Sequence, residues 1–309
     1  MYLLVLSSMG SQGDSDPWTV QCVQQCESRF NCSSPYNSWD ANVGPLDWIS
    51  QWDCSAECKY QCMRQHTKLR TDSGLPVVQY HGKWPFRRVL GMQELFSSVF
   101  SITNAIPNVV YFFKYRDAVP DSYYLKPLFL TYAVTTTITW IFSAAFHARD
   151  TRLTEALDYY FADLTWTFIA IWTTIRFFDI QSKRGIFLVF LLFGSVYIRL
   201  IYYLTFIKFD YAWNTLVGVV MATWQSGLWL RWAYLHWKKC SYAKLIVITQ
   251  FMSWVAGSME ILDFAPFFEL LDAHAIWHGM TSVLGFYLWE WVLQDALYNN
   301  DRIEKKKII

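Results

Sequence analysis

The sequence S-A-A-F-H-A-R-D-T-R-L-T-E-A-L-D, residues 143–158, closes one long apolar stretch and opens the next. Ser143 lies four residues before His147, and Asp158 lies eleven residues after that histidine. Four residues are about one helical turn, so Ser143 and His147 are neighbours on one helix face. The segment therefore predicts a short turn between two apolar helices, with three polar side chains close to it.

A second segment, L-D-A-H-A-I-W-H-G-M at 271–280, places His274 and His278 four residues apart, again on one helix face. A single histidine near a helix end is usually a paired polar residue. Three histidines beside apolar stretches favour a metal site. With His147, they provide the three neutral imidazoles that leave a tetrahedral Zn²⁺ one open position for water, as in catalytic zinc sites.

The composition is typical of a membrane protein. Of 309 residues, 54% are hydrophobic, 19% are aromatic and 17% are charged, and there are 17 tryptophans. The apolar residues are gathered in long runs, which favours membrane spans over a large soluble core. The formal net charge of +1 argues against a nucleic-acid-binding protein.

Seven apolar segments, each near the ~20 residues that cross a bilayer, predict an all-α membrane protein with a seven-transmembrane helix bundle. We place them at about 95–113, 127–146, 158–177, 185–204, 212–233, 244–262 and 275–294. The first is the weakest, because it contains Asn104, Pro107 and Asn108. The expected domains are a signal peptide at 1–13, a luminal cysteine-rich domain at 14–92, the spans at 93–296 and a cytosolic tail at 297–309. The signal peptide is short and has no basic start.

Six of the seven cysteines precede the first span, and none forms a C-x2-C pair, which argues against a zinc ribbon. They are Cys22, Cys26, Cys32, Cys54, Cys58 and Cys62. We expect about three disulfides, with 15 connectivities open, and hence an oxidising compartment. Asn31 begins a glycosylation sequon that fits the same side of the membrane, although a sequon beside a bridged cysteine can go unused. Cys240 is expected to be free.

Basic residues give the orientation independently of the cysteines. With a luminal N-terminus, the cytosolic loops and tail carry Lys114, Arg116, Lys126, Arg176, Lys183, Arg184, Arg231, Lys238, Lys239, Lys244, Arg302 and Lys305–Lys307, against luminal Arg149, Arg152 and Lys208. This bias follows the positive-inside rule. It also brings the three histidines, Ser143 and Asp158 to one depth near the luminal leaflet. Ionisable groups at that depth are functional candidates.

The C-terminus carries Lys306 and Lys307 at the fourth and third positions from the end. This pattern resembles the dilysine retrieval signal of early secretory membrane proteins, and it predicts a multi-pass protein of the endoplasmic reticulum or Golgi membrane. Coat machinery would be the partner of such a tail. The alternative interpretation is an ordinary cluster of cytosolic basic residues.

Four motifs together resemble one family over nearly the whole chain. They are Cys54-x3-Cys58-x3-Cys62-Met63, His81-Gly-Lys-Trp-Pro-Phe86, Phe146-His-x-Arg-Asp150 and Leu271-Asp-Ala-His-Ala-Ile-Trp-His278. They resemble the post-GPI-attachment-to-proteins factor 3 (Per1-like) family, which is grouped with alkaline ceramidases and adiponectin/progestin receptors. The resemblance implies GPI-anchor remodelling by a metal-dependent, phospholipase A2-like hydrolase. GPI-anchored proteins would be the substrate, and the products would be lyso-GPI and the sn-2 fatty acid.

The resemblance also implies roles for the site residues. His147, His274 and His278 would hold Zn²⁺, which lowers the pKa of a bound water toward about 7. Asp158 would act as the base on that water or would orient a ligand histidine. Ser143 would donate a hydrogen bond to the water or to the developing oxyanion.

Three further residues are weaker candidates near the same leaflet. Asp272 precedes His274 by two residues and would orient a ligand, or it is simply solvated in a loop. Arg199 would meet the inositol phosphate or would pair with Glu260. Either acid at the end of the sixth span, Glu260 or Asp263, would line the pocket or would simply sit at the membrane interface. His81 is a possible fourth ligand, although an exposed loop histidine is the simpler interpretation.

Three other functions fit parts of these patterns. A seven-span receptor with a structural zinc is disfavoured by the luminal cysteines and the lysine tail. A ceramide amidase is disfavoured by the cysteine-rich domain and by the segment His81–Phe86. A non-catalytic chaperone for GPI-anchored proteins would retain its function after loss of the histidines.

Overall fold

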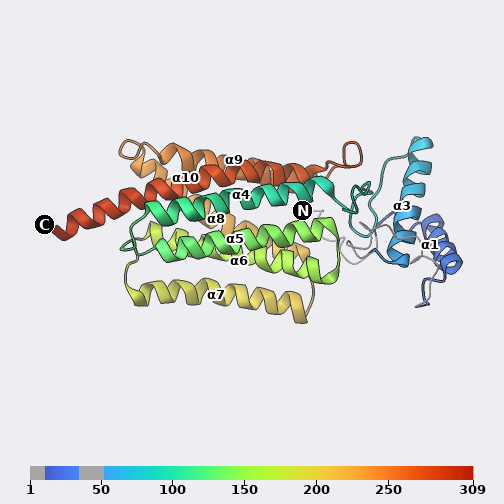
Figure 1. Cartoon of the computed structure of the whole chain (residues 1–309), viewed down its shortest axis with the longest axis horizontal. Coiled ribbons are helices and arrows are strands. Elements are labelled where there is room, and N and C mark those ends of the chain that lie inside the picture. The colour runs from blue at the N-terminus through green and yellow to red at the C-terminus, as the bar shows by residue number, and fades with distance from the viewer. Residues whose placement is uncertain (1–10, 35–51, 309) are drawn as a thin grey trace.

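The computed structural model describes residues 11–34 and 52–308, without the side chains of 260, 261 and 304–308. Regular structure in this part of the chain is helical, with only isolated β-bridges, and it confirms the all-α prediction (Figure 1). The helices are α1 (Pro17–Phe30), α3 (Cys54–Asp72), α4 (Leu95–Ala118), α5 (Lys126–Ala148), α6 (Arg152–Phe177), α7 (Lys183–Phe206), α8 (Tyr211–His236), α9 (Ala243–Leu262) and α10 (Ala273–Ile308). Most of the predicted signal peptide falls outside the described residues.

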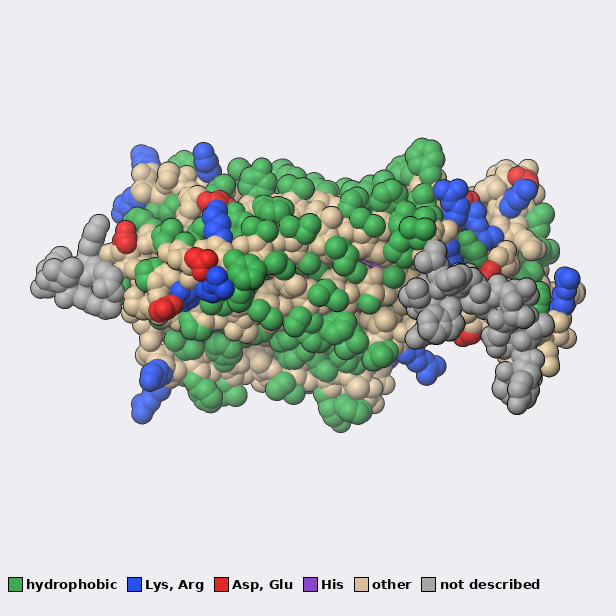
Figure 2. Space-filling view, in the orientation of Figure 1, with side chains coloured by type: hydrophobic (Ala, Val, Ile, Leu, Met, Phe, Trp, Pro, Cys, Tyr) green, Lys and Arg blue, Asp and Glu red, His purple; other side chains and the backbone are tan. Residues whose placement is uncertain are grey.

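The seven long helices, α4 to α10, coincide with the seven apolar segments of the sequence. Among the described residues, α4, α5 and α7 are long and apolar enough to cross a membrane. Hydrophobic side chains cover the middle of the molecule, and charged side chains gather toward its two ends (Figure 2). These features confirm the transmembrane character of the chain.

Six of the long helices form a closed ring. Around the ring α4 packs against α5, α5 against α6, α6 against α8, α8 against α9, α9 against α10, and α10 returns to α4, while α7 packs on the outside of α6. Large side chains fill the interior, among them Trp172 of α6, Trp229 of α8 and Trp289 and Trp291 of α10, all at most 1% exposed. Burial of each such indole side chain contributes roughly 2–3 kcal/mol to the free energy of folding, so many of the tryptophans serve the core of the bundle.

The polar residues that weaken the first predicted span face the interior of the ring. Asn104 donates to the main-chain oxygen of His278 at 2.7 Å, and Asn108 accepts from the indole of Trp289 at 2.9 Å. Pro107 lies against Gly285, where an added Cβ would come within 2.7 Å of the proline ring. Helix α4 is therefore fixed against α10 by hydrogen bonds and close backbone approach, and this contact positions one of the candidate ligands.

The N-terminal helices are held together by three disulfides. Helix α1 begins at Pro17 behind the capping carboxylate of Asp16, and it lies beside α3. The pairs are Cys22–Cys62, Cys26–Cys58 and Cys32–Cys54, with Cα–Cα distances of 5.8, 5.6 and 5.4 Å. The predicted disulfides are confirmed, and their order is nested: Cys22 and Cys26 of α1 pair with Cys62 and Cys58 of α3, and Cys32, just after α1, pairs with Cys54 at the start of α3. Cys240 is free and buried.

Asn31 ends α1 in the left-handed region, with φ of 51°, and its side chain is exposed. Asparagine is one of the residues that tolerate this conformation at a helix end. Its glycosylation stays a prediction.

Removing the central disulfide is expected to destabilise the N-terminal helix pair. The double variant Cys26→Ser/Cys58→Ser should lower the free energy of opening α1 and α3 by about 2–4 kcal/mol, because the unfolded segment regains its loop entropy. Hydrogen exchange of the two helices measures this directly. The matched control is Cys240→Ala, which removes a buried thiol elsewhere. Equal protection of α1 in both variants would contradict the expected role of the crosslink.

Candidate metal centre

The last turn of α5 and the start of α10 lie at the end of the bundle that faces α3 (Figure 1). Three histidines from these two helix ends meet there. His147 comes from the last turn of α5, and His274 and His278 come from the first two turns of α10. Their Nε2 atoms are mutually close: His147 to His274 is 3.3 Å, His147 to His278 is 3.1 Å, and His274 to His278 is 3.0 Å. The rings of His147 and His278 are buried, and that of His274 is half-buried.

This spacing fits a shared cation. Two ligand nitrogens of a tetrahedral zinc ion, each at about 2.0–2.1 Å from the metal, lie about 3.3 Å apart. Without a cation, three imidazole nitrogens directed at one another would bring their lone pairs together, which is unfavourable unless protons lie between them. The donor set is three neutral nitrogens, which suits Zn²⁺. The one other close group in the described part of the chain, Cys32, Cys54 and Cys58, is already bonded in disulfides.

Helix ends bring these rings together. Asp272 caps α10 by accepting from the main-chain N–H of Ala275 at 2.8 Å, so this candidate partner of a ligand acts here as a helix cap. The cap sets the start of α10, and the four-residue spacing then aligns His274 with His278. Helix α5 ends at Ala148 and is followed by Arg149, whose backbone is extended, so His147 lies in the final turn.

Glu94 fixes the orientation of His147. Its Oε2 atom lies 2.6 Å from Nδ1 of His147, and its Oε1 atom accepts from Nζ of Lys83 at 2.7 Å. Lys83 also pairs with Asp150 at 3.1 Å. A proton on Nδ1 that is donated to Glu94 leaves Nε2 of His147 with a free lone pair, the form a metal requires.

Glu94 is ionised in this setting. Its side chain is only 5% exposed, just before α4 begins. Burial alone would raise its pKa, but the Lys83 ammonium, followed by the His147 imidazole, holds the pKa of the Glu94 carboxyl well below its ordinary value. The carboxylate is therefore a permanent acceptor for the Nδ1–H group of His147.

Ser101 plays the corresponding part for His278. Its hydroxyl donates to the main-chain oxygen of Ser97 at 2.7 Å, and its oxygen lies 3.3 Å from Nδ1 of His278. Because the single hydroxyl proton goes to Ser97, the serine oxygen accepts from Nδ1–H of His278. This again leaves Nε2 directed at the cluster as an acceptor.

Ser143 and Asp158 lie beside the histidines. Ser143 is buried one turn before His147, and its oxygen is 3.3 Å from that of Ser101. The carboxylate of Asp158, in the second turn of α6, accepts from the Ser143 hydroxyl and interacts electrostatically with His147 and His274. All five main residues singled out from the sequence therefore lie in one group at one end of the bundle.

The remaining candidates lie elsewhere or outside the described part of the chain. Arg199 is exposed on α7. His81 is exposed and lies 3.6 Å from Asp14, and Asp263 accepts from the indole of Trp84 at 2.7 Å. The side chains of Glu260, Lys306 and Lys307 are outside the described residues.

Sequence reasoning missed Glu94 and Lys83. Glu94 immediately precedes the first apolar segment, at the bundle end where all the other candidates were expected. An acidic residue at that position could have been identified from the sequence as a candidate partner of the histidines. Lys83 stands in the motif His81–Phe86, in which the histidine was the candidate ligand. The lysine, and not the histidine, contacts the site, by donating to Glu94.

Replacing Glu94 by glutamine is expected to weaken Zn²⁺ binding by about 10- to 100-fold, the usual effect of losing the partner of a ligand histidine. Glutamine keeps the size of the side chain but loses the charge that favours the required tautomer. Competition with a zinc-binding dye, on purified full-length protein, measures the affinity. Glu290→Gln is the matched control, because Glu290 pairs with Lys114 and Tyr111. Equal Zn²⁺ affinities in the two variants would show that Glu94 pairs with Lys83 but does not support zinc binding by His147.

Comparison with known proteins identifies relatives of this chain. The profile of the Per1-like family matches residues 46–296. The chain is 32% identical to the "GPI-specific phospholipase A2-like PGAP3" of Cricetulus griseus over 294 residues, which cover 94% of this chain and 90% of that protein. It is 35% identical to the "Post-GPI attachment to proteins factor 3" of Drosophila melanogaster, over 96% of this chain and 92% of that protein. It is 33% identical to the "Protein PER1 homolog" of Schizosaccharomyces pombe, over 94% of this chain and 88% of that protein. No solved structure matches the chain. The chain belongs to the Per1-like family.

Proposed function

We propose that this protein is a zinc-dependent hydrolase that removes the sn-2 acyl chain from the GPI anchor of proteins, giving lyso-GPI and a fatty acid. The observation that carries the proposal is the convergence of three Nε2 atoms within 3.0–3.3 Å of one another. The names of the relatives support a role in GPI-anchor remodelling, and one of them names a phospholipase A2-like activity.

The residues divide the work of an ester hydrolysis. His147, His274 and His278 hold the ion, with Glu94 and Ser101 keeping protons on Nδ1 of His147 and His278. Bound Zn²⁺ supplies Lewis acidity toward a water molecule and the ester carbonyl.

Asp158 handles the proton of the reaction. Its carboxylate takes a proton from the attacking water and returns it to the sn-2 alcohol oxygen, which stays on the glycerol and leaves the acyl carbon. Ser143 holds that carboxylate in place by donating to it. Water adds one hydroxyl to the acyl carbon and one proton to the leaving oxygen, so the reaction balances without any other reactant.

Seven membrane crossings with a luminal N-terminus are part of the same proposal. The seven helices coincide with the apolar segments, and basic residues are concentrated at the loops of one end. The disulfide-bonded helices α1 and α3 lie at the opposite end, beside the metal centre (Figure 1). Because disulfides persist in oxidising compartments, this arrangement supports a site in the luminal leaflet of the endoplasmic reticulum or Golgi membrane. Lys306 and Lys307 would then face the cytosolic coat machinery.

The direct test uses purified full-length protein in lipid nanodiscs with a purified GPI-anchored protein as substrate. The expected result is release of one fatty acid per anchor and a matching lyso-GPI in the mass spectrum. Both products should disappear after removal of zinc by a chelator and return when zinc is restored. Zinc-loaded protein that leaves the anchor intact would contradict the hydrolase.

A non-catalytic factor with a structural zinc is the second candidate. It is favoured by the name of the Drosophila relative, which describes a factor rather than an enzyme. Such a protein would leave anchor lipids unchanged in the nanodisc experiment while still binding GPI-anchored proteins.

A further inference from the structure

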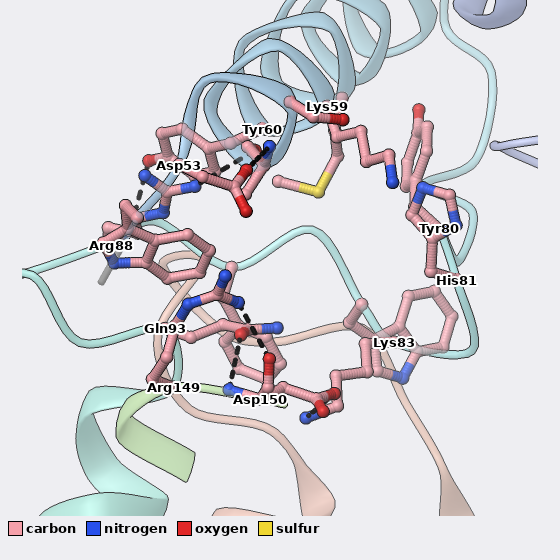
Figure 3. Close-up of a pocket in the computed structure, with 16 residues that line it drawn as sticks. Asp53, Lys59, Tyr60, Tyr80, His81, Lys83, Arg88, Gln93, Arg149 and Asp150 are labelled. Atoms are coloured by element: carbon pink, nitrogen blue, oxygen red, sulfur yellow. Dashed lines mark hydrogen bonds and ion pairs between the residues drawn. The ribbon is translucent and has the colours of Figure 1, made fainter. Parts of the chain in front are cut away.

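A cavity of about 360 Å³ separates α3 from the end of the bundle that holds the metal centre (Figure 3). Its upper wall is the start of α3, from Asp53 to Met63. Its other walls are the segment from Tyr80 to Arg88, Gln93, and the pair Arg149 and Asp150. Lys59 and Arg149 lie on opposite sides of this space (Figure 3).

The lining is positively charged and only partly neutralised. Four lining residues are cationic and two are carboxylates: Lys59, Lys83, Arg88 and Arg149 against Asp53 and Asp150. Lys83 pairs with Asp150, and Arg88 pairs with Glu57. Within the described residues, no carboxylate lies within ion-pair distance of Arg149 or Lys59. Arg149 and Lys59 therefore line the cavity without a direct ion pair, and the carboxylates of Asp53 and Asp150 act on Arg149 only from a longer distance.

Arg149 is held in place by stacking and by donating from its guanidinium to the main-chain oxygen of Asp150 at 2.8 Å. Its guanidinium lies 3.8 Å from the centre of the Trp52 ring, and that of Arg88 lies 3.4 Å from the same ring. The Nε atoms of both arginines are buried without a hydrogen-bond partner in the described part of the chain. Two like charges on one aromatic ring repel each other, and an anion in the cavity would relieve this repulsion.

The cavity is joined to the metal centre by short contacts. Lys83 lines the cavity and donates to Glu94, and Glu94 contacts His147. Arg149 follows His147 by two residues. In a glycerophospholipid the phosphate is attached to the carbon next to the one that bears the sn-2 ester. A lipid whose sn-2 ester lies at the three histidines therefore has its phosphate only a few bonds away.

We propose that this cavity binds the phosphodiester-linked inositol of the GPI anchor, with Arg149 and Lys59 as the ligands of the phosphate. The inference rests on the proposed function and names the part of the substrate that the site recognises. Guanidinium groups bind phosphate oxygens through paired hydrogen bonds, and an ammonium adds a point charge. Asp53 and Gln93 offer hydrogen-bond partners to the hydroxyl groups of the inositol ring.

The binding experiment uses full-length protein in nanodiscs of phosphatidylcholine and titrates glycerophosphoinositol by calorimetry. Wild-type protein is expected to bind it, and Arg149→Gln is expected to raise Kd at least tenfold. Arg152→Gln, an exposed arginine three residues along and outside the lining, should stay within twofold. Lys59→Gln should raise Kd at least threefold against its control Lys68→Gln, exposed on the same helix. The Lys59 pair keeps the test valid if Arg149→Gln fails to fold.

Two other titrants separate the sources of a phosphate group. Glycerophosphocholine should bind at least tenfold more weakly than glycerophosphoinositol, and inorganic phosphate should also bind more weakly. Equal affinity for inorganic phosphate would make the cavity a general anion site and overturn the proposal. Absence of glycerophosphoinositol binding to wild-type protein would overturn it as well.

Kinetics separate this inference from the proposed function. With a GPI-anchored substrate, Arg149→Gln should raise KM at least tenfold and change kcat less than threefold, the pattern of lost substrate binding. Hydrolysis with an unchanged KM and an unchanged Kd would remove the head-group site and leave the hydrolase standing. If wild-type protein binds the head group but hydrolyses nothing, the head-group site stands and the proposed hydrolase activity is contradicted.

Discussion

The His278→Ala variant is expected to lose nearly all bound zinc and at least about 10³-fold in the rate of acyl release, a loss of about 4 kcal/mol of transition-state stabilisation. His278 is 1% exposed and supplies one of three nitrogens, and its Nδ1 side is set by Ser101. Two remaining imidazoles cannot complete the ligand set of a catalytic zinc site. Zinc content by mass spectrometry and lyso-GPI formation in nanodiscs measure the two effects together.

His236→Ala is the matched control. His236 stacks on Trp232 of α8 and bonds to a main-chain oxygen there, outside the metal centre. It should keep zinc and activity within a fewfold of wild type. In cells that carry only His278→Ala, anchors should keep their original acyl chains. If anchors in such cells are still remodelled, the three histidines have no part in the hydrolysis.

Asp158→Asn is expected to lower kcat by about 10²- to 10⁴-fold while zinc stays bound, because an amide of the same shape cannot take the proton of the attacking water. The asparagine retains an oxygen that accepts from Ser143, so the local geometry is kept. Initial rates and zinc content on the same preparation decide between the two roles left open by the sequence. Full activity would exclude Asp158 from proton transfer, and loss of zinc would make it a residue that supports the ligands.

Asp163→Asn serves as the control for this variant. Asp163 is a buried carboxylate on the same helix, five residues further on, and it accepts from Asn214 once that amide is turned so that its nitrogen faces the carboxylate. A similar loss of kcat in both variants would point to a general effect of neutralising α6 rather than to a specific base.

Local periodicity was sufficient to predict the long helices and the shared face of His274 and His278. Each depends on spacings of a few residues, which the sequence displays directly. Helix α10 is longer than the predicted last span and continues to Ile308, through the predicted tail. After Gly285 the sequence contains no glycine or proline that would end it.

Contacts between distant segments were not predictable in the same way. Lys83, Glu94 and His147 come from three separate segments, and their ion pairs appear only once the chain is folded. Composition and topology also directed attention to Arg199, an arginine within an apolar segment. The structure leaves that residue exposed on α7 and places Arg149, which had been counted only as a loop charge, in the wall of the cavity.

X-ray absorption at the zinc edge, on purified full-length protein, tests the central claim most directly. The account predicts about one zinc ion per chain, with three nitrogen ligands from imidazole at about 2.0–2.1 Å, and loss of this signal in His274→Ala. Sulfur ligands, or a wild-type protein that contains no metal after purification without chelators and does not take up zinc, would contradict it.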